Sequence, residues 1–144
     1  MEPKIAVDTR ESVESWQEAV QDAAGFLVEL DVAEPRYVTA CVDSLYKNGP
    51  YIVLTPGVAL AHARPEDGAT GLGVTLVRLR QPVEFGHPKN DPVDLVFAFC
   101  TPEAGGHIAL LKKLAMALGK GLAPRLRDAS DSELEPVLRA ALQD

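Results

Sequence analysis

The spacing of apolar positions along the first third of the chain predicts two helices. Between Ser15 and Leu30, apolar side chains recur every three or four residues, which is the pattern of a helix that buries one face. The same spacing follows Pro35, and proline is favoured in the first turn of a helix. This second helix is expected to end at the letters KNGP, because Gly49 suits a C-terminal cap and Pro50 cannot continue a helix.

The middle of the chain carries short apolar runs that are rich in β-branched residues and predict strands. The predicted strands are residues 51–55 (YIVLT), the run GVALAH that ends at His62, residues 72–79 (LGVTLVRL), residues 82–85 (PVEF) and residues 93–100 (VDLVFAFC), with residues 1–10 as a loose start or a short edge strand. The run VDLVFAFC is apolar almost throughout, which is typical of a strand at the centre of a sheet with both faces covered.

The C-terminal part of the chain returns to helical spacing. An apolar stripe between Ile108 and Leu118 predicts one helix. Another is expected from about residue 132 to residue 142, with Ser130 or Asp131 as its cap. The order of helices, strands and helices predicts an α/β fold in which a mixed β-sheet is sandwiched between helices.

The composition limits the classes of protein to which the chain can belong. With 144 residues, of which 47% are apolar, the chain is expected to form a single domain (1–144, with a core of about 16–142). Its formal net charge of −7 argues against nucleic-acid binding, which needs clustered Lys and Arg, and favours a partner with a basic face. No signal peptide and no run of about 20 apolar residues is found in the sequence, so a cytoplasmic protein without membrane insertion is expected.

Two of the three histidines stand in settings that suit phosphoryl chemistry. His62 ends an apolar run, with Arg64 two residues further on, and is therefore expected at a strand end near water. A neutral imidazole there can attack a phosphoryl group and form a phosphohistidine, with Arg64 as a donor to the new negative charge. The alternative for His62 is a core residue whose polar atoms are satisfied.

His107 follows two glycines at the predicted start of a helix. The first turn of a helix has unpaired N–H groups and the positive end of the helix dipole, so it favours anions such as phosphate. The glycines would let a ligand approach the backbone. The alternative is a histidine that faces solvent.

The other candidates carry weaker signals. His87 lies in the turn-forming segment GHPKNDP and is expected to be a loop residue. Cys41 and Cys100 lie in apolar runs and are expected to be buried, and the histidine and cysteine spacings match no common metal site. Four basic residues are expected to be solvated surface charges, with a small basic rim around a phosphate site as the alternative. They are Arg78, Arg80, Lys112 and Lys113.

Two segments resemble a known family of bacterial proteins. The segments YIVLTPGVALAHARPEDGATGLGVTLVRLRQPVEFG (51–86) and DPVDLVFAFCTPEAGGHIALLKKLAMAL (91–118) look like the enzyme IIA domain of the mannitol–fructose class of the bacterial phosphoenolpyruvate-dependent sugar phosphotransferase system. The letters PYIVLTPGVAL and PVEFGHPKNDPV look most like the stand-alone IIA proteins of the ascorbate type. The resemblance runs from about Trp16 to Leu142, and it implies the same mixed sheet between helices.

The resemblance also implies the roles of a phosphotransferase. In the family, the histidine of the segment G-[IV]-A-x-P-H, here His62, accepts the phosphoryl group from the phosphocarrier protein HPr as a tele-phosphohistidine. The second histidine of the family, here His107, opens a helix, lies close to the first and supports the phosphorylated state. Arg64 and amides at the helix start are expected to bind the phosphoryl oxygens. The group then passes to a IIB component, and the membrane IIC component moves the sugar, with ascorbate as the candidate. No cofactor and no metal is expected.

One position departs from the family pattern. The residue before the active histidine is usually proline, and here it is Ala61, which constrains the backbone less and is expected at worst to slow the transfer. It also favours the alternative of a regulatory IIA module of the nitrogen-related type, whose phosphorylation state gates binding to other proteins. A binding module that no longer accepts phosphate is disfavoured by the presence of both histidines. An apolar rim is expected to dock the carrier protein, with core packing as the alternative for its members, Val58, Leu60, Ile108 and Leu111.

Overall fold

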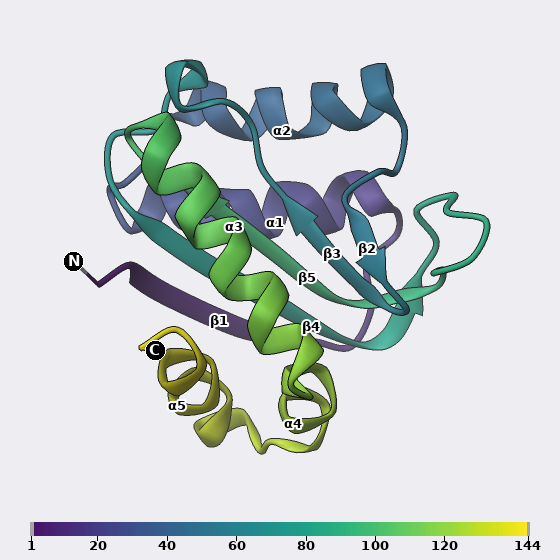
Figure 1. Cartoon of the computed structure of the whole chain (residues 1–144). Helices are drawn as coiled ribbons and strands as arrows, with labels where there is room; N and C mark the ends of the chain where they lie inside the picture. The colour runs from purple at the N-terminus through teal and green to yellow at the C-terminus, as the bar shows by residue number, and fades with distance from the viewer. Residues whose placement is uncertain (1, 144) are drawn as a thin grey trace.

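A five-stranded mixed sheet lies between two groups of helices in the computed structural model, which describes residues 2–143 (Figure 1). The strands are β1 (Lys4–Arg10), β2 (Val53–Thr55), β3 (Val58–Ala61), β4 (Gly73–Val83) and β5 (Val93–Cys100). The helices are α1 (Trp16–Glu29), α2 (Pro35–Asn48), α3 (Ala104–Gly119), α4 (Leu122–Asp128) and α5 (Asp131–Ala141), and a short 3-10 helix (Pro65–Asp67) follows β3. The predicted α/β fold, a mixed sheet sandwiched between helices, is therefore confirmed.

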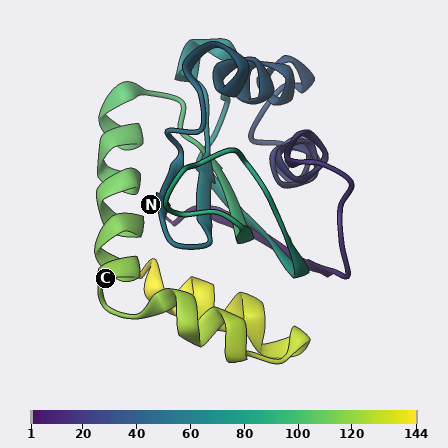
Figure 2. The same cartoon turned by 90° about the vertical axis from the view of Figure 1, so that its right-hand side faces the viewer.

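The strand order across the sheet is β1-β4-β5-β3-β2. β5 lies in the centre, as its apolar sequence predicts, and β1 is an edge strand that pairs with β4 in parallel. β3 also runs parallel to its neighbour β5, whereas β4 and β5, and β2 and β3, are antiparallel. Figure 2 shows α1 and α2 on one side of the sheet and α3, α4 and α5 on the other.

The two N-terminal helices form where the apolar spacing predicts them. Ser15 caps α1, because its side chain accepts the N–H of Glu18 at 3.3 Å. Pro35 is the first residue of α2, and the helix ends before Gly49, whose φ of 82° lies in the left-handed region that glycine tolerates. Ser130 caps α5, as the sequence predicts.

The sheet divides the core into two layers, and β3 contributes to both. Its side chains alternate, as strand geometry requires. Ala59 and Ala61 pack in the layer under α1 and α2, whereas Val58 and Leu60 pack in the layer under α3, α4 and α5. The next side chain in this alternation, His62, therefore belongs to the α3 side of the sheet.

Three details differ from the sequence-based expectations. β4 continues through Val83 with a register shift, so residues 82–85 form no separate strand. Helix α4 is not predicted by the apolar spacing, since it is short and contains Pro124. Arg78, expected on a solvated face, is buried beneath the turn between α4 and α5, whereas Arg80 is exposed as expected.

Within residues 2–143, no helix has both the length and the apolar character needed to cross a membrane.

Candidate active site

His62 is the first residue after β3, a strand whose four side chains are all buried. The strand is held on one side by β5 and on the other by β2, so its end is a fixed point of the fold. Beyond His62 the chain turns at Arg64 into the short 3-10 helix that begins with Pro65. The half-buried ring therefore lies at a strand end, as the sequence predicts.

His107 reaches the same place from the neighbouring strand. β5 runs parallel to β3, so both strands end at the same edge of the sheet. A short connection follows β5, and α3 begins at Ala104, which places His107 in the first turn with its N–H bonded to the carbonyl of Glu103 at 3.1 Å. The ring centroids of His62 and His107 are 5.1 Å apart, with an angle of 68° between the ring planes.

Phe99 supports both histidine rings. Its ring is stacked on His62 with a centroid distance of 5.0 Å, and it is tilted against His107 at 5.2 Å. Phe99 itself is fully buried in β5 and cannot move without disturbing the sheet. The ring centroids of Tyr51 and His62 are 6.1 Å apart, with an angle of 86° between the ring planes. These contacts hold the His62 ring in one orientation.

A backbone contact fixes the tautomer of His62. Nδ1 lies 2.9 Å from the carbonyl oxygen of Leu60. Because a carbonyl oxygen can only accept, Nδ1 carries the proton of the neutral ring and the lone pair lies on Nε2. Nε2 is therefore the ring nitrogen with a free lone pair, and it is the tele nitrogen that the family resemblance names.

The pKa values of both histidines are lowered, which favours the neutral form of each ring. Burial lowers the pKa of His62 below its usual value, the nearby His107 lowers it further, and the hydrogen bond to Leu60 partly opposes them. Burial also lowers the pKa of His107. At neutral pH, Nε2 of His62 therefore has a free lone pair.

The hydrogen bonding of His107 also favours one tautomer. Its Nδ1 is buried and has no hydrogen-bonding partner among residues 2–143. A proton on this atom would be an unpaired buried donor, which costs about 1–3 kcal/mol. The proton is therefore favoured on Nε2, where it can be donated to a neighbouring group.

His62 and His107 both line a cavity of about 610 Å³, which lies between α2 and the segments that follow β3 and β5. The lining combines two cationic side chains, two carboxylates and several neutral groups. It consists of Ala40, Asp43, Ser44, Lys47, Asn48, Tyr51, His62, Ala63, Arg64, Asp67 and His107. The structure thus brings all three predicted site residues, His62, His107 and Arg64, to one cavity, and it adds Lys47, which the sequence alone could not assign.

Arg64 lines the histidine cavity, and its side chain forms ion pairs with Glu66 and Asp67. Its guanidinium donates to both carboxylate oxygens of Asp67 at 3.2 and 3.3 Å, and its backbone N–H donates to the same carboxylate at 3.0 Å. The hydrogen bond from Arg64 is the main reason why the pKa of Asp67 is lowered. Arg64 must therefore leave Asp67, at least in part, to bind an anion beside His62.

Tyr37 is a buried support that sequence analysis missed. Its hydroxyl donates to the carbonyl of Phe99 at 2.8 Å and accepts the N–H of Ala63 at 3.1 Å. It thus joins the strand under the histidine rings to the residue that follows His62. The sequence shows Tyr37 as one more apolar position of a helix, and both partners of its hydroxyl lie far along the chain.

The cysteines and the remaining charges lie outside this chemistry. Cys41 and Cys100 are buried as predicted, and burial raises the pKa of both thiols, that of Cys100 to about 12. The described residues contain no cluster of three metal-binding side chains. The alternative of a basic rim built from four expected surface charges is wrong, since none of them lines the histidine cavity. They are Arg78, Arg80, Lys112 and Lys113.

The predicted docking rim is correct only in part. Val58 and Leu60 are fully buried in the core, so they cannot form a docking surface. Ile108 is 61% exposed beside His107, and Leu111 is partly buried. One exposed aromatic residue that lines the histidine cavity, Tyr51, is not among the residues that the sequence predicts for this rim.

The sequence and the fold place this site in a known protein family. Residues 2–133 match the family described as the phosphoenolpyruvate-dependent sugar phosphotransferase system, EIIA 2. The chain belongs to this family, and its fold is that of the mannitol-type IIA proteins.

Individual relatives are similar to this chain to different extents. The "Ascorbate-specific PTS system EIIA component" of Escherichia coli (strain K12) is 46% identical over 94 residues, which are 65% of this chain and 61% of that protein. The chain thus aligns with about three fifths of the curated relative's length. The solution structure of the mannitol-specific cryptic phosphotransferase enzyme IIA CmtB from Escherichia coli is 31% identical with a TM-score of 0.84, over 96% of this chain and 95% of that chain. The nitrogen regulatory protein IIA-Ntr from Neisseria meningitidis is 30% identical with a TM-score of 0.75, over 96% of this chain and 92% of that chain.

Proposed function

We propose that the protein accepts a phosphoryl group from the phosphocarrier protein HPr on Nε2 of His62 and passes it to a IIB component. The observation that carries this proposal is the hydrogen bond between Nδ1 of His62 and the Leu60 carbonyl, which leaves Nε2 as the unprotonated nitrogen. His62 also lines the cavity that contains His107 and Arg64. Membership of the EIIA 2 family supports the same activity.

The reaction is a direct displacement at phosphorus. The lone pair on Nε2 of His62 forms the new N–P bond while the bond between phosphorus and the donor atom of HPr breaks, and its electron pair returns to the donor. No proton needs to leave His62, because its single ring proton stays on Nδ1 and remains bonded to Leu60. The product carries its phosphoryl group in the cavity next to His107.

The surrounding groups would stabilise the negative charge of the phosphoryl oxygens. His107 donates from Nε2, and its short distance from His62 suits a group attached to the first ring. Lys47 contributes a positive charge from the end of α2. Arg64 exchanges part of its contact with Asp67 for a phosphoryl oxygen.

The proposed partners are supported by membership of the EIIA 2 family and by the relatives. The IIB component then hands the group on to the sugar, which the membrane IIC component transports, and we expect the soluble steps to run in the cytoplasm. The resemblance to ascorbate-specific EIIA components makes ascorbate the proposed sugar.

A regulatory role is the second candidate function. The observation that favours it is the similarity, at 30% identity, to the nitrogen regulatory protein IIA-Ntr. In that role the same phosphohistidine forms on His62, but it gates binding to another protein and is not passed to a transporter. The two functions share the first step and differ in the second.

Intact-mass spectrometry can test both steps. The full chain is incubated with phosphoenolpyruvate, enzyme I and HPr, and one acid-labile phosphoryl group is expected on the wild type and on a His87→Ala control, but not on His62→Ala. Absence of the group from the wild type, with a competent HPr, would overturn the proposal. Addition of an ascorbate-type IIB component should then remove the group. A phosphorylated protein that transfers to no IIB component would support the regulatory function instead.

A further inference from the structure

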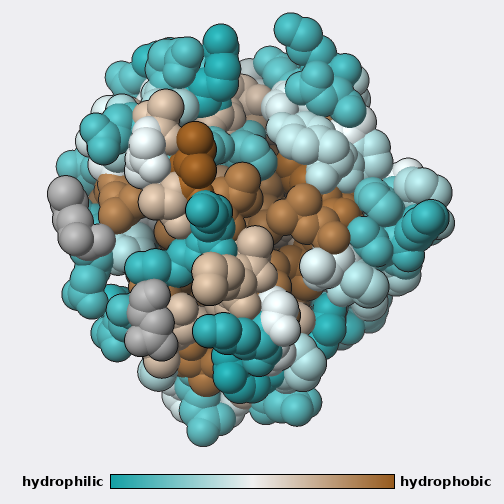
Figure 3. All heavy atoms as spheres, viewed as in Figure 1, coloured by the Kyte–Doolittle hydropathy of each residue, from teal (hydrophilic) through white to brown (hydrophobic). Residues whose placement is uncertain are grey.

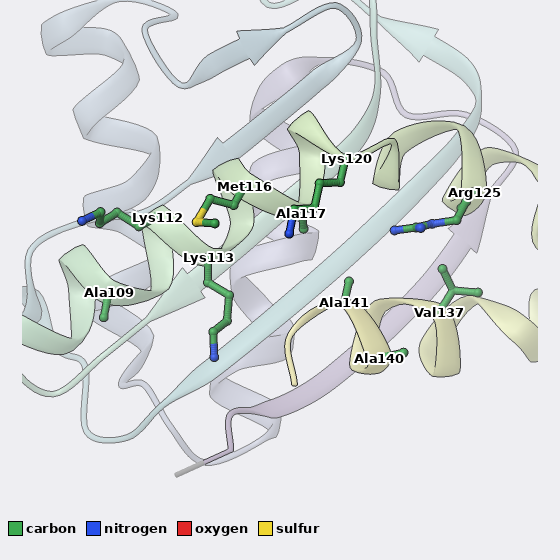
Figure 4. Close-up of a pocket in the computed structure, with 10 residues that line it drawn as sticks. All are labelled: Ala109, Lys112, Lys113, Met116, Ala117, Lys120, Arg125, Val137, Ala140 and Ala141. Atoms are coloured by element: carbon green, nitrogen blue, oxygen red, sulfur yellow. The ribbon is translucent and has the colours of Figure 1, made fainter. Parts of the chain in front are cut away.

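A second cavity, whose lining does not include the histidine pair, lies along α3 from Ala109 to Lys120, between α3 and α5 (Figure 4). Its volume is about 570 Å³, and the apolar part of its lining comes from both helices. These residues are Ala109, Met116 and Ala117 of α3 and Val137, Ala140 and Ala141 of α5. In Figure 4, Val137 and Ala141 point from α5 towards α3.

The apolar lining of this groove is exposed at Met116 and recessed at Ala117. Met116 is 60% exposed, although a methionine of this size usually finds a place in the core. Helix α3 buries Leu110, Leu114 and Ala117 in the core, so Met116 lies beside the buried face. Ala109 and Met116 thus form an exposed apolar part of α3 next to the buried face. Figure 3 shows apolar side chains at the surface in the middle of the α3 side, surrounded by hydrophilic ones.

Four basic side chains, and no acidic one, line the same groove. They are Lys112, Lys113, Lys120 and Arg125. This concentration is unusual in a chain with a net charge of −7. Seven of the eight arginines form ion pairs with carboxylates of residues 2–143, and Arg125 is the exception. None of the three lysines forms such a pair with the described carboxylates either.

We infer that this groove, which we call the α3–α5 groove, binds an acidic amphipathic helix of a partner protein. An apolar floor flanked by unpaired cations is complementary to a helix with one apolar stripe and carboxylates beside it. Along α3, the lining from Ala109 to Lys120 extends over about 16 Å, which is the length of roughly three helical turns. Met116 would provide an adaptable apolar contact at the centre.

Other occupants fit the surface less well. A second copy of the chain offers no suitable helix among the described residues, because α1, α2, α3 and α5 each pack an apolar face in the core. An anionic membrane would repel a protein with a net charge of −7, and the floor at Ala117 is recessed, with 8% exposure. The inference does not depend on phosphoryl transfer, because no residue of the groove lines the histidine cavity.

A designed peptide can test the inference on the full chain. The probe is a capped peptide of about 15 residues with leucines at helical spacing and glutamates on either side of them, and the control is a peptide of the same composition in scrambled order. Binding is followed by the amide chemical shifts of the labelled protein. The amphipathic peptide alone is expected to cause shifts, and these should be confined to residues 109–120 and to the parts of α4 and α5 that line the groove.

Matched variants identify the cause of binding. Lys113→Glu should weaken binding by about tenfold or more, since a charge reversal at the contact replaces attraction with repulsion. Lys89→Glu makes the same change of charge on an exposed loop outside the groove and should leave the affinity within about twofold. Met116→Gln tests the apolar floor and should also weaken binding.

Several results would overturn the inference. They are equal binding of both peptides, shifts located elsewhere, and no binding at millimolar peptide. Concentration-dependent dimerisation that Lys113→Glu abolishes would assign the groove to a second copy. Flotation with anionic vesicles would assign it to a lipid surface.

Discussion

The hydroxyl of Tyr37 accepts the N–H of Ala63 at 3.1 Å, and this contact fixes the backbone immediately after His62. The same hydroxyl donates to the carbonyl of Phe99, on whose ring His62 is stacked. The family usually constrains the backbone before the active histidine with a proline, and this chain has Ala61 there. Tyr37 constrains the position from the other side.

Tyr37→Phe removes this hydroxyl and leaves the ring in place. The buried N–H of Ala63 and carbonyl of Phe99 then lose a partner, so the free energy of unfolding should fall by about 1–3 kcal/mol. Phosphorylation of His62 should also become slower, because its support is less rigid. Urea denaturation and the rate of mass gain measure the two effects.

The matched control is Tyr46→Phe. Tyr46 is 66% exposed, and its hydroxyl accepts only the side chain of Gln17 among the described residues. This change should alter stability by less than about 0.5 kcal/mol. Equal effects of the two substitutions would contradict the role assigned to Tyr37.

His107→Ala and His107→Gln should differ in their effects on the phosphorylated state. Alanine removes the donor next to His62, and loss of a hydrogen bond to a charged group costs about 1.5–3 kcal/mol. That corresponds to a rate or lifetime reduced roughly 10- to 150-fold. Glutamine can place an amide N–H near the position of Nε2 and should recover part of the loss. Equal rates for alanine, glutamine and the wild type would exclude donation by His107.

The two site histidines should titrate below the usual histidine value of about 6.5. Burial is the main cause of the lowered pKa in each. The unfolded chain takes up protons on these rings at a higher pH than the native protein does. The free energy of unfolding should therefore be fully retained above about pH 6.5 and should decrease as the pH falls below it. Ring titration by NMR and denaturation at several pH values provide the measurement, and midpoints above the usual value would contradict it.

Arg78→Met should destabilise the protein without affecting its chemistry. The buried guanidinium donates to the carbonyls of Leu126 and Ala129 at 2.7 and 2.6 Å, and to Asp131 at 2.8 Å. Loss of these donors should lower the free energy of unfolding by about 2–5 kcal/mol. Phosphorylation of the folded variant should proceed at the wild-type rate.

Arg80→Met is the comparison for Arg78→Met. Arg80 lies on the same strand, is mostly exposed, and makes one longer contact with Asp131 at 3.7 Å. Its loss should cost no more than about 1 kcal/mol. Similar destabilisation by both substitutions would show that the buried carbonyl contacts of Arg78 contribute little.

The sequence predicts the elements well where one face of a segment is buried. The apolar spacing gives α1 and α2 almost to the residue, since each has a clear cap and a single buried face. It misses α4, because a helix of 7 residues with a proline has too little periodicity to detect.

Contacts between distant segments are harder to predict. The alternation of β4 correctly places Arg78 and Arg80 on one face, but it does not tell which part of that face another segment covers. Residue identity suggests a role for His62 and His107 separately. The family resemblance implies that the two rings lie close together, but local patterns do not. Their proximity depends on β3 and β5 being parallel neighbours, and strand order cannot be read from such patterns. The partners of Tyr37 are hidden for the same reason.

The bond from His62 to the Leu60 carbonyl has a consequence for the energy of the phosphorylated protein. A carboxylate in that position would make the imidazole a stronger base and therefore a poorer leaving group. A neutral carbonyl two residues earlier in the same strand orients the ring without this effect. On the proposed function, the N–P bond should then remain easy to break, so that the phosphoryl group can move to the next protein, or back to the donor, with little loss of free energy.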